Sequence, residues 1–267
     1  MASAEPQFVT VGHGADCRRI ACMVERAEAA GPGVMWLPGF KSEMTSTKVT
    51  ALAEWAAERS RPMTRLDYSG HGMSGGNLQD GTIGRWIEEV STVFATLTRG
   101  PQVVVGSSMG GYLALLLVRT LMREAPETAA RIRSLVLIAP AWDMTERLME
   151  PRLNAAARRD IAETGVWMRP SRYGDGPYPI TRRLLEEGRR HLIGTAAFDP
   201  GRPVHILHGL QDPDVPWEHT LDLVAHLDGD WTQVIAVPDG DHRLSRPEDL
   251  TLLLATVAEA SRDPDDA

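Results

Sequence analysis

A serine between glycines is the residue of this sequence with the clearest chemical potential. Residues 106–110 read Gly-Ser-Ser-Met-Gly and fit the pattern G-x-S-x-G with Ser108 at its centre. Three valines, 103–105, precede the pattern and an apolar stretch follows it, which is the strand–turn–helix setting of a nucleophilic serine. We expect Ser108 to be a nucleophile rather than part of an ordinary turn. Ser107 does not qualify, because glycines do not flank it at the required spacing.

A serine hydroxyl is a weak nucleophile, so it needs a histidine base that a carboxylate orients. Where a serine stands on such a turn, the order along the chain is serine, acid, histidine. Two segments downstream, 208–216 and 239–242, each follow an apolar run and contain these residue types. We predict Asp212 as the acid, because it comes directly after the strand-end turn. We predict His242 as the base.

Several other polar residues compete for these roles. Asp214 lies two residues beyond Asp212 and is the main alternative acid, and Asp143, after another predicted strand, is a third. His205 and His208 are three residues apart on a predicted strand, so they point to opposite faces and a shared metal ion is not expected. We expect neither a metal nor an organic cofactor, because acyl transfer by serine and histidine needs none.

Acyl transfer also needs N–H donors that hold the oxyanion of the tetrahedral intermediate. One donor is the backbone N–H of the residue after the nucleophile, here Met109. The other comes from the loop after the third strand, which here begins Pro-Gly-Phe at 38–40. Since Pro38 has no N–H, the expected second donor is Phe40. A plain strand-ending turn is the alternative interpretation of this segment.

The elements that must position these residues alternate between strand and helix patterns along the chain. This alternation predicts an α/β fold with a mostly parallel sheet and helices on both faces. An antiparallel hairpin, 7–12 and 18–25, is expected to open the chain. Thr82 is expected to cap the second helix. The other predicted strands are 34–37, 63–67, 103–105, 135–138, 204–207 and 234–237; the predicted helices are 46–59, 83–97, 113–122, 217–227 and 248–260.

The alternation stops after the sixth predicted strand and resumes near residue 204, a gap far longer than an ordinary connection. Helical patterns near 145–163 and 180–193 flank a turn-rich piece, 169–179. We interpret residues 142–200 as a small helical cap inserted into a single domain, 1–267. Flexible methionines and aromatic residues suit an adaptable apolar pocket. The cap residues that we expect to line such a pocket are Trp142, Met144, Trp167 and Met168.

The composition of the chain indicates which binding partners and which cellular compartment to expect. The chain has 267 residues and a formal net charge of −8, which disfavours nucleic acid and anionic membrane surfaces as partners. The sequence contains no run of 18 apolar residues, so no membrane span is expected. The first residues lack the features of a secretory signal or transit peptide. The two cysteines are expected to be reduced, and we interpret the protein as cytoplasmic.

Taken together, these residues resemble the α/β-hydrolase fold over nearly the whole chain. Several segments are similar to the alpha/beta-hydrolase domain-containing protein 10 group: 38–44 with 47–48, 67–70, 106–113, 166–171, 208–217 and 241–243. Animal members of that group are mitochondrial serine hydrolases described as palmitoyl-protein thioesterases and acyl-glucuronide esterases. The resemblance implies the same three groups, Ser108, Asp212 and His242, as the catalytic triad.

The residues and the resemblance together predict a serine hydrolase that cleaves carboxylic esters or thioesters through an acyl-enzyme. Its expected substrate is a small acyl ester or thioester, or an S-acylated protein. One alternative is a different acyl chemistry, such as a C–C bond hydrolase or a cofactor-free perhydrolase. Another is a ligand-binding protein without turnover, since a fold does not guarantee a function. Acyl-chain length and oligomeric state cannot be predicted from these residues.

Overall fold

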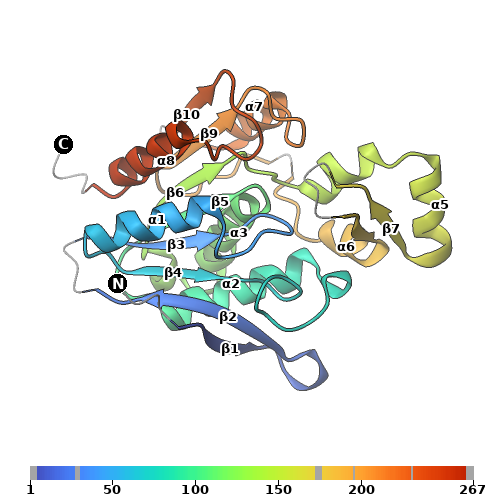
Figure 1. Cartoon of the computed structure of the whole chain (residues 1–267), viewed down its shortest axis with the longest axis horizontal. Coiled ribbons are helices and arrows are strands. Elements are labelled where there is room, and N and C mark those ends of the chain that lie inside the picture. The colour runs from blue at the N-terminus through green and yellow to red at the C-terminus, as the bar shows by residue number, and fades with distance from the viewer. Residues whose placement is uncertain (1–4, 28–30, 172–175, 195, 230, 263–267) are drawn as a thin grey trace.

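The central element of the molecule is a twisted sheet whose strand order is β1-β2-β4-β3-β5-β6-β9-β10. The computed structural model describes residues 5–27, 31–171, 176–194, 196–229 and 231–262. Within them β2 runs antiparallel to its neighbours β1 and β4, and the pairings from β4 to β10 are parallel (Figure 1). The strands are β1 Gln7–Val11, β2 Arg18–Glu25, β3 Gly33–Leu37, β4 Met63–Leu66, β5 Gln102–Ser107, β6 Ile132–Ile138, β9 Val204–Gly209 and β10 Thr232–Val237.

Helices cover both faces of this sheet, which confirms the predicted α/β-hydrolase architecture. Successive side chains of a strand point to opposite faces, and β3 shows this directly. Val34 and Trp36 belong to the apolar cluster beneath α1 and α8, whereas Met35 and Leu37 belong to the cluster beneath α2 and α3. Continuous apolar strands are therefore buried on both sides. The helices are α1 Thr47–Glu58, α2 Ile83–Leu97, α3 Met109–Glu124, α4 Pro126–Ala129, α7 Trp217–His226 and α8 Pro247–Ala260.

Most helix boundaries agree with the sequence analysis, and one differs for a reason that matters. The Thr82 side chain accepts a hydrogen bond from the N–H of Arg85, so it caps α2 as predicted. In contrast, α3 begins at Met109 and not near residue 113. Glycines have low helix propensity, so those at 110 and 111 do not suggest a helix start before them. The nucleophile turn nevertheless requires small residues there, and the helix includes them because it starts directly after Ser108.

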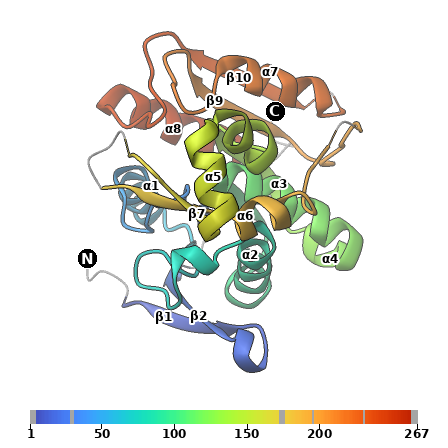
Figure 2. The same cartoon turned by 90° about the vertical axis from the view of Figure 1, so that its right-hand side faces the viewer.

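The chain leaves the sheet after β6 and returns at β9, and the segment between them forms the expected cap over the carboxyl ends of the strands (Figures 1 and 2). The predicted helix 145–163 is interrupted: two short helical turns end at Arg152, and α5 starts anew behind the capping residue Asn154. Proline at 151 lacks an N–H and favours such a break. The elements of the cap are Thr145–Met149, Glu150–Arg152, α5 Ala155–Thr164, β7 Val166–Arg169, β8 Tyr178–Thr181 and α6 Arg182–Gly188.

Besides its helices, the cap contains a two-stranded antiparallel sheet, β7 with β8, which the sequence analysis did not predict. Each of the two segments, 166–169 and 178–181, is only four residues long. Without knowledge of its partner strand, such a short segment resembles an irregular, turn-rich region. Residues 172–175 of the predicted turn-rich piece lie outside the described residues. The second predicted cap helix, 180–193, is shorter in the structure. α6 begins at Arg182, because Thr181 caps its first turn by accepting a hydrogen bond from the N–H of Leu184 at 3.0 Å, and it ends at Gly188.

Two polar anchors hold the returning end of the cap against the domain. The carboxylate of Asp143 accepts hydrogen bonds from the N–H groups of Ile193 and Gly194 at 2.7 and 3.0 Å. The Tyr112 hydroxyl, on α3, donates to the carbonyl of His191 at 3.0 Å. The Asp143 bonds join the two ends of the cap to each other, and the Tyr112 bond fastens the cap to α3, the helix that begins directly after Ser108.

Candidate active site

The turn at Ser108 has the geometry that an exposed nucleophile requires. Ser108 has φ 54° and ψ −116°, in the region that favours glycine, and such a backbone costs on the order of 1–3 kcal/mol. Its N–H donates to the Ile138 carbonyl of β6 at 2.8 Å, which helps to hold the conformation. A Cβ at Gly106 would lie 2.3 Å from the Gly110 carbonyl oxygen, and one at Gly110 only 2.0 Å from that of Leu37. Both glycines are therefore required by close backbone approach.

Asp212 and His242 meet at the carboxyl ends of β9 and β10. The Nδ1 atom of His242 lies 2.7 Å from Oδ2 of Asp212, whose carboxylate is fully buried. The other oxygen, Oδ1, accepts the N–H groups of Asp214 and Val215, both at 2.8 Å. This second pair of bonds fixes the carboxylate, so the imidazole of His242 is oriented by a rigid acceptor.

The competing acids have other surroundings. Asp214 is partly exposed, lines the cavity described below, and lies 3.6 Å from the guanidinium of Arg169. Asp143 is buried, with both carboxylate oxygens bonded to backbone N–H groups of the cap. His208 is also buried; its Nε2 lies 3.1 Å from the Val215 carbonyl and its Nδ1 lies 2.8 Å from the Thr220 hydroxyl. Of the predicted acids, Asp212 is the one that contacts His242.

The loop after β3 lies against the nucleophile turn. A Cβ at Gly39 would meet the Ser107 carbonyl oxygen at 3.3 Å and the Ser108 Cβ at 3.4 Å. The Tyr68 hydroxyl donates to the Pro38 carbonyl at 3.0 Å, and burial raises the pKa of this phenol well above its ordinary value. Tyr68 is therefore a permanent donor that ties this loop to the end of β4.

Two further contacts fix the remainder of that loop. The Asp67 carboxylate accepts the N–H of Met44 at 2.7 Å and that of Met73 at 2.8 Å, so it joins the loops after β3 and β4. The ring of Phe40 makes edge contacts with His71, Trp86 and the cap residue Tyr178, with centroids 5.7–5.9 Å apart. The position of the Phe40 N–H thus depends on both the domain and the cap. Sequence reasoning gave no positioning role to Asp67 or Tyr68, although both lie in a segment of the family resemblance.

The expected oxyanion donors are located at this junction. Met109 is the first residue of α3, and the first N–H groups of a helix have no partner within it. For the described residues, the backbone contacts outside regular elements include no acceptor for the N–H of Phe40 or of Met109. Both groups come from segments held beside Ser108, and the amino end of α3 favours negative charge.

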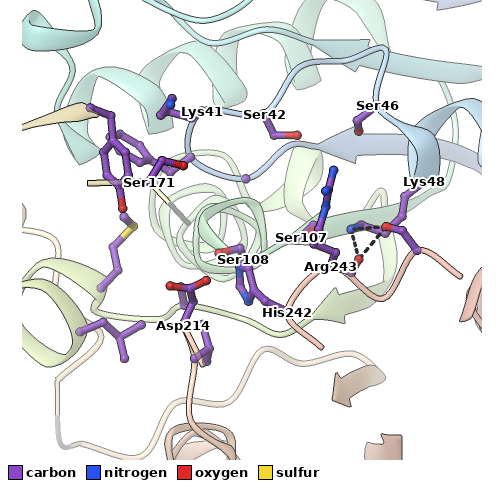
Figure 3. A pocket seen from close by; sticks show the side chains of 18 of the residues that line it. Lys41, Ser42, Ser46, Lys48, Ser107, Ser108, Ser171, Asp214, His242 and Arg243 are labelled. Carbon is purple, nitrogen blue, oxygen red and sulfur yellow. Dashed lines mark hydrogen bonds between the residues drawn. The ribbon is translucent and has the colours of Figure 1, made fainter. Parts of the chain in front are cut away.

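A cavity of about 350 Å³ joins Ser108 and His242, which occupy the middle of the view in Figure 3. Of the four residues expected to line a pocket, Met144 lines it. Trp142 is fully buried elsewhere, with its Nε1 donating to the His219 carbonyl at 2.9 Å. Trp167 packs against the core, and Met168 is 45% exposed on the adjacent cap strand. Trp142, Trp167 and Met168 are therefore not among the described residues that line the cavity.

The charges along the cavity contrast with the acidic chain as a whole. Five cationic side chains line it, and Asp214 is the one carboxylate among the described lining residues. Burial lowers the pKa of Lys48 to about 8. Sequence reasoning missed this feature, because its members come from separate segments. The cationic residues are Lys41, Lys48, Arg152, Arg169 and Arg243.

Backbone strain gathers around the same cavity. Non-glycine residues with positive φ include Lys41 and Ser108, which line it, and Leu244, which follows the lining residue Arg243. Strained residues of this kind persist where the surrounding structure enforces them, and they cluster at functional sites. No group of three or more His, Cys, Asp or Glu side chains within the described ranges could hold a metal ion. None of the helices in those ranges combines the length and apolar character needed to cross a bilayer.

Comparison with known proteins agrees with this geometry. The Alpha/beta hydrolase family is matched over residues 31–251. The chain is 31% identical over 234 residues to palmitoyl-protein thioesterase ABHD10, mitochondrial, of Bos taurus, which covers 87% of this chain and 74% of the bovine protein. The solved structure of mouse alpha/beta hydrolase domain-containing protein 10 superposes with a TM-score of 0.82 at 29% identity, over 96% of this chain and 98% of that one.

A second solved structure is more similar still. A protein of Agrobacterium vitis S4 superposes with a TM-score of 0.93 at 42% identity and covers 97% of this chain and 99% of its own. The similarity thus extends through the cap as well as the sheet. These comparisons confirm the predicted resemblance to the alpha/beta-hydrolase domain-containing protein 10 group.

Proposed function

Because the chain belongs to the alpha/beta hydrolase family, we propose that it is a serine hydrolase that cleaves carboxylic esters or thioesters through an acyl-enzyme. The observation that carries this proposal is the 2.7 Å contact between His242 and the buried Asp212, on the cavity that the strained Ser108 also lines. A nucleophile, a base and an orienting carboxylate in this arrangement are the requirements for acyl transfer.

The proposed mechanism uses each group in turn. Asp212 accepts a hydrogen bond from the Nδ1–H group of His242, so Nε2 carries a free lone pair. As the Ser108 oxygen attacks the acyl carbonyl, Nε2 takes its proton, and the N–H groups of Phe40 and Met109 stabilise the oxyanion. The C–O or C–S bond to the leaving group then breaks, and the imidazolium protonates the departing oxygen or sulfur. Water, activated by the same histidine, releases the acid and restores Ser108.

The substrate class is proposed from the relatives. The mammalian proteins are named palmitoyl-protein thioesterases, which supports a long-chain thioester on a protein as one candidate; an acyl glucuronide is the other that the resemblance implies. The apolar cap residues Met144, Leu148 and Met149 on the cavity wall suit an acyl chain. The cytoplasmic location also stays a proposal, and the mammalian relatives are named as mitochondrial.

Labelling with a fluorophosphonate tests the mechanism. We expect a covalent adduct on Ser108, located by mass spectrometry, together with hydrolysis of p-nitrophenyl esters and of acyl thioesters. Ser108→Ala should lose both the adduct and the turnover while melting at the same temperature. An adduct at another serine, or turnover by Ser108→Ala close to that of the wild type, would refute the assignment. Folded protein with neither adduct nor turnover would favour a ligand-binding role. A series of acyl chains from two to sixteen carbons separates short-chain from palmitoyl substrates.

A further inference from the structure

His242, the proposed base, stands on a tight turn after β10, residues 239–245, which we call the histidine turn. The Gly240 carbonyl accepts the N–H of Gln211 at 2.9 Å, which ties the start of the turn to the end of β9. Within the turn, the Asp241 carboxylate accepts the N–H groups of the two residues after His242 at 2.9 and 3.1 Å. These contacts shape the turn locally, but they do not attach the chain after His242 to the rest of the domain.

The chain directly after His242 has a strained backbone. Leu244 has φ 40°, and a residue with such a conformation costs on the order of 1–3 kcal/mol unless its surroundings enforce it. Its side chain is 4% exposed and packs in the apolar cluster beneath α1 and α8. A contact on the adjacent peptide group, whose oxygen belongs to Arg243, would help to hold this conformation.

Lys48, in the first turn of α1, makes that contact. Its Nζ donates to the Arg243 carbonyl, 195 positions away along the chain, and to the Ser245 hydroxyl at 3.4 Å. The Ser245 hydroxyl in turn donates to the same carbonyl at 2.9 Å. The dashed lines beside Lys48 in Figure 3 mark these bonds, on the wall of the cavity that also contains His242. Lys48 is therefore a tertiary link between α1 and the histidine turn.

Folding stability alone does not account for an amine at this position. Lys48 is half-buried, and burial lowers its pKa to about 8. The carboxylates that act on it have other partners: Asp241 accepts backbone N–H groups, and Asp249 forms a 2.9 Å ion pair with Arg246. A partly buried cation loses water, and an apolar side chain of similar length would avoid that cost.

We propose that Lys48 is a positioning residue for the catalytic base. By holding the Arg243 carbonyl, it fixes the backbone on the carboxyl side of His242, while Asp212 orients the ring through its 2.7 Å contact with Nδ1. A single contact at Nδ1 allows the ring to tilt about that point, so the backbone contact decides whether Nε2 is directed at Ser108. The inference rests on the proposed function, because that function makes His242 the base.

The variant Lys48→Met tests the proposal in the full-length protein, since it keeps the length of the side chain and removes the donor. The turn keeps its other contacts, so we expect kcat to fall by about tenfold, less than the roughly 10²-fold loss that a 1 Å misplacement can cause. KM should change little. The melting temperature should stay the same or rise, because a partly buried cation is removed. Lys48→Arg, which keeps a donor, should recover most of the lost kcat.

A direct contact between Lys48 and the substrate must be distinguished from positioning, because Lys48 lines the cavity. The assay therefore uses two uncharged esters, p-nitrophenyl acetate and p-nitrophenyl hexanoate. Positioning of the base predicts the same fold loss of kcat for both esters, and the same fold loss in the rate at which a fluorophosphonate labels Ser108. Glu54→Met is the matched control, since it replaces an exposed charged residue of the same helix; it should keep the wild-type kcat.

Proton NMR provides a signature that a purely structural role would not change. The proton between His242 and the buried carboxylate of Asp212 is expected to give a strongly downfield resonance. In Lys48→Met this resonance should shift or broaden, because the ring is no longer held in one orientation. Lys48→Arg should restore it, and Glu54→Met should leave it as in the wild type.

Several results would overturn the proposal while leaving the serine hydrolase assignment intact. They are a wild-type kcat in folded Lys48→Met, a loss that appears only in KM or differs between the two esters, and a melting temperature that falls together with kcat. If Lys48→Met does not fold, Ser245→Ala decides, since it removes the second donor to the same carbonyl: its kcat should fall, and an unchanged kcat refutes the role. A wild-type protein that cleaves neither ester and gains no fluorophosphonate adduct would instead refute the proposed function itself.

Discussion

The contact between Asp212 and His242 predicts a large loss of kcat in the variant Asp212→Asn. The oxygen Oδ1 accepts two backbone N–H groups, those of Asp214 and Val215, at 2.8 Å each. An asparagine at 212 must keep its carbonyl oxygen toward these donors, because an NH₂ group there would face two N–H groups. Its NH₂ group then points at the Nδ1 atom of His242, which lies 2.7 Å from Oδ2 in the native protein.

This arrangement would force the wrong tautomer on the base. Nδ1 would have to accept a hydrogen bond from the amide NH₂ group, so the ring proton of neutral His242 would be on Nε2, the atom that must take the serine proton. We expect kcat to fall by about 10³- to 10⁴-fold, as for the corresponding change in other serine enzymes. Folding should be little affected, since the variant keeps the two backbone bonds and the shape of the side chain.

The assay is kcat with a p-nitrophenyl ester across pH, alongside thermal unfolding. Asp214→Asn is the matched control: Asp214 is partly exposed beside Arg169, so we expect its kcat to stay within about threefold, as for a surface ion pair. The reasoning is refuted if Asp212→Asn keeps more than a tenth of the wild-type kcat. It is equally refuted if Asp214→Asn is the crippled variant.

Two further predictions follow from the turn and the oxyanion loop. Gly110→Ala would place a Cβ 2.0 Å from the Leu37 carbonyl oxygen; we expect a loss of about 3 kcal/mol by urea unfolding, whereas Gly165→Ala, with open space around it, should cost about 1 kcal/mol. Tyr68→Phe removes the hydroxyl that holds Pro38; kcat should fall about tenfold, less than for loss of an oxyanion donor itself, and an unchanged kcat would contradict the role.

Much of the candidate site could be predicted because its signals are local. Ser108 is marked by its glycine neighbours, and the structure shows that each glycine is demanded by backbone atoms within 2.3 Å of an added Cβ. The order of acid and histidine along the chain selected Asp212 and His242, since both follow strands whose carboxyl ends meet at one edge of the sheet. Thr82 could be assigned as a cap from its residue type alone.

Three predicted pocket residues do not line the cavity, because an apolar or aromatic side chain can pack against several different surfaces. Trp142 has the composition of a pocket residue, yet its indole N–H bonds to His219 and its ring packs under α7. Trp167 and Met168 follow the alternation of a strand whose partner, β8, begins at Tyr178, nine residues after β7 ends at Arg169. A sequence pattern records that a side chain is apolar, but it does not record which of several apolar surfaces will cover it.

The amino-acid sequence by itself determined the fold class, the nucleophile turn and the order of the acid and the base, because these depend on short-range backbone sterics and on the alternation of strands and helices. The tertiary structure alone decided which cap residues reach the cavity and that Trp36, Lys48 and Arg243 line it together. These three residues are separated by up to about two hundred positions. Their proximity follows from strand order and from the packing of α1 and α8 on one face of the sheet, which are properties of the assembled chain rather than of any segment.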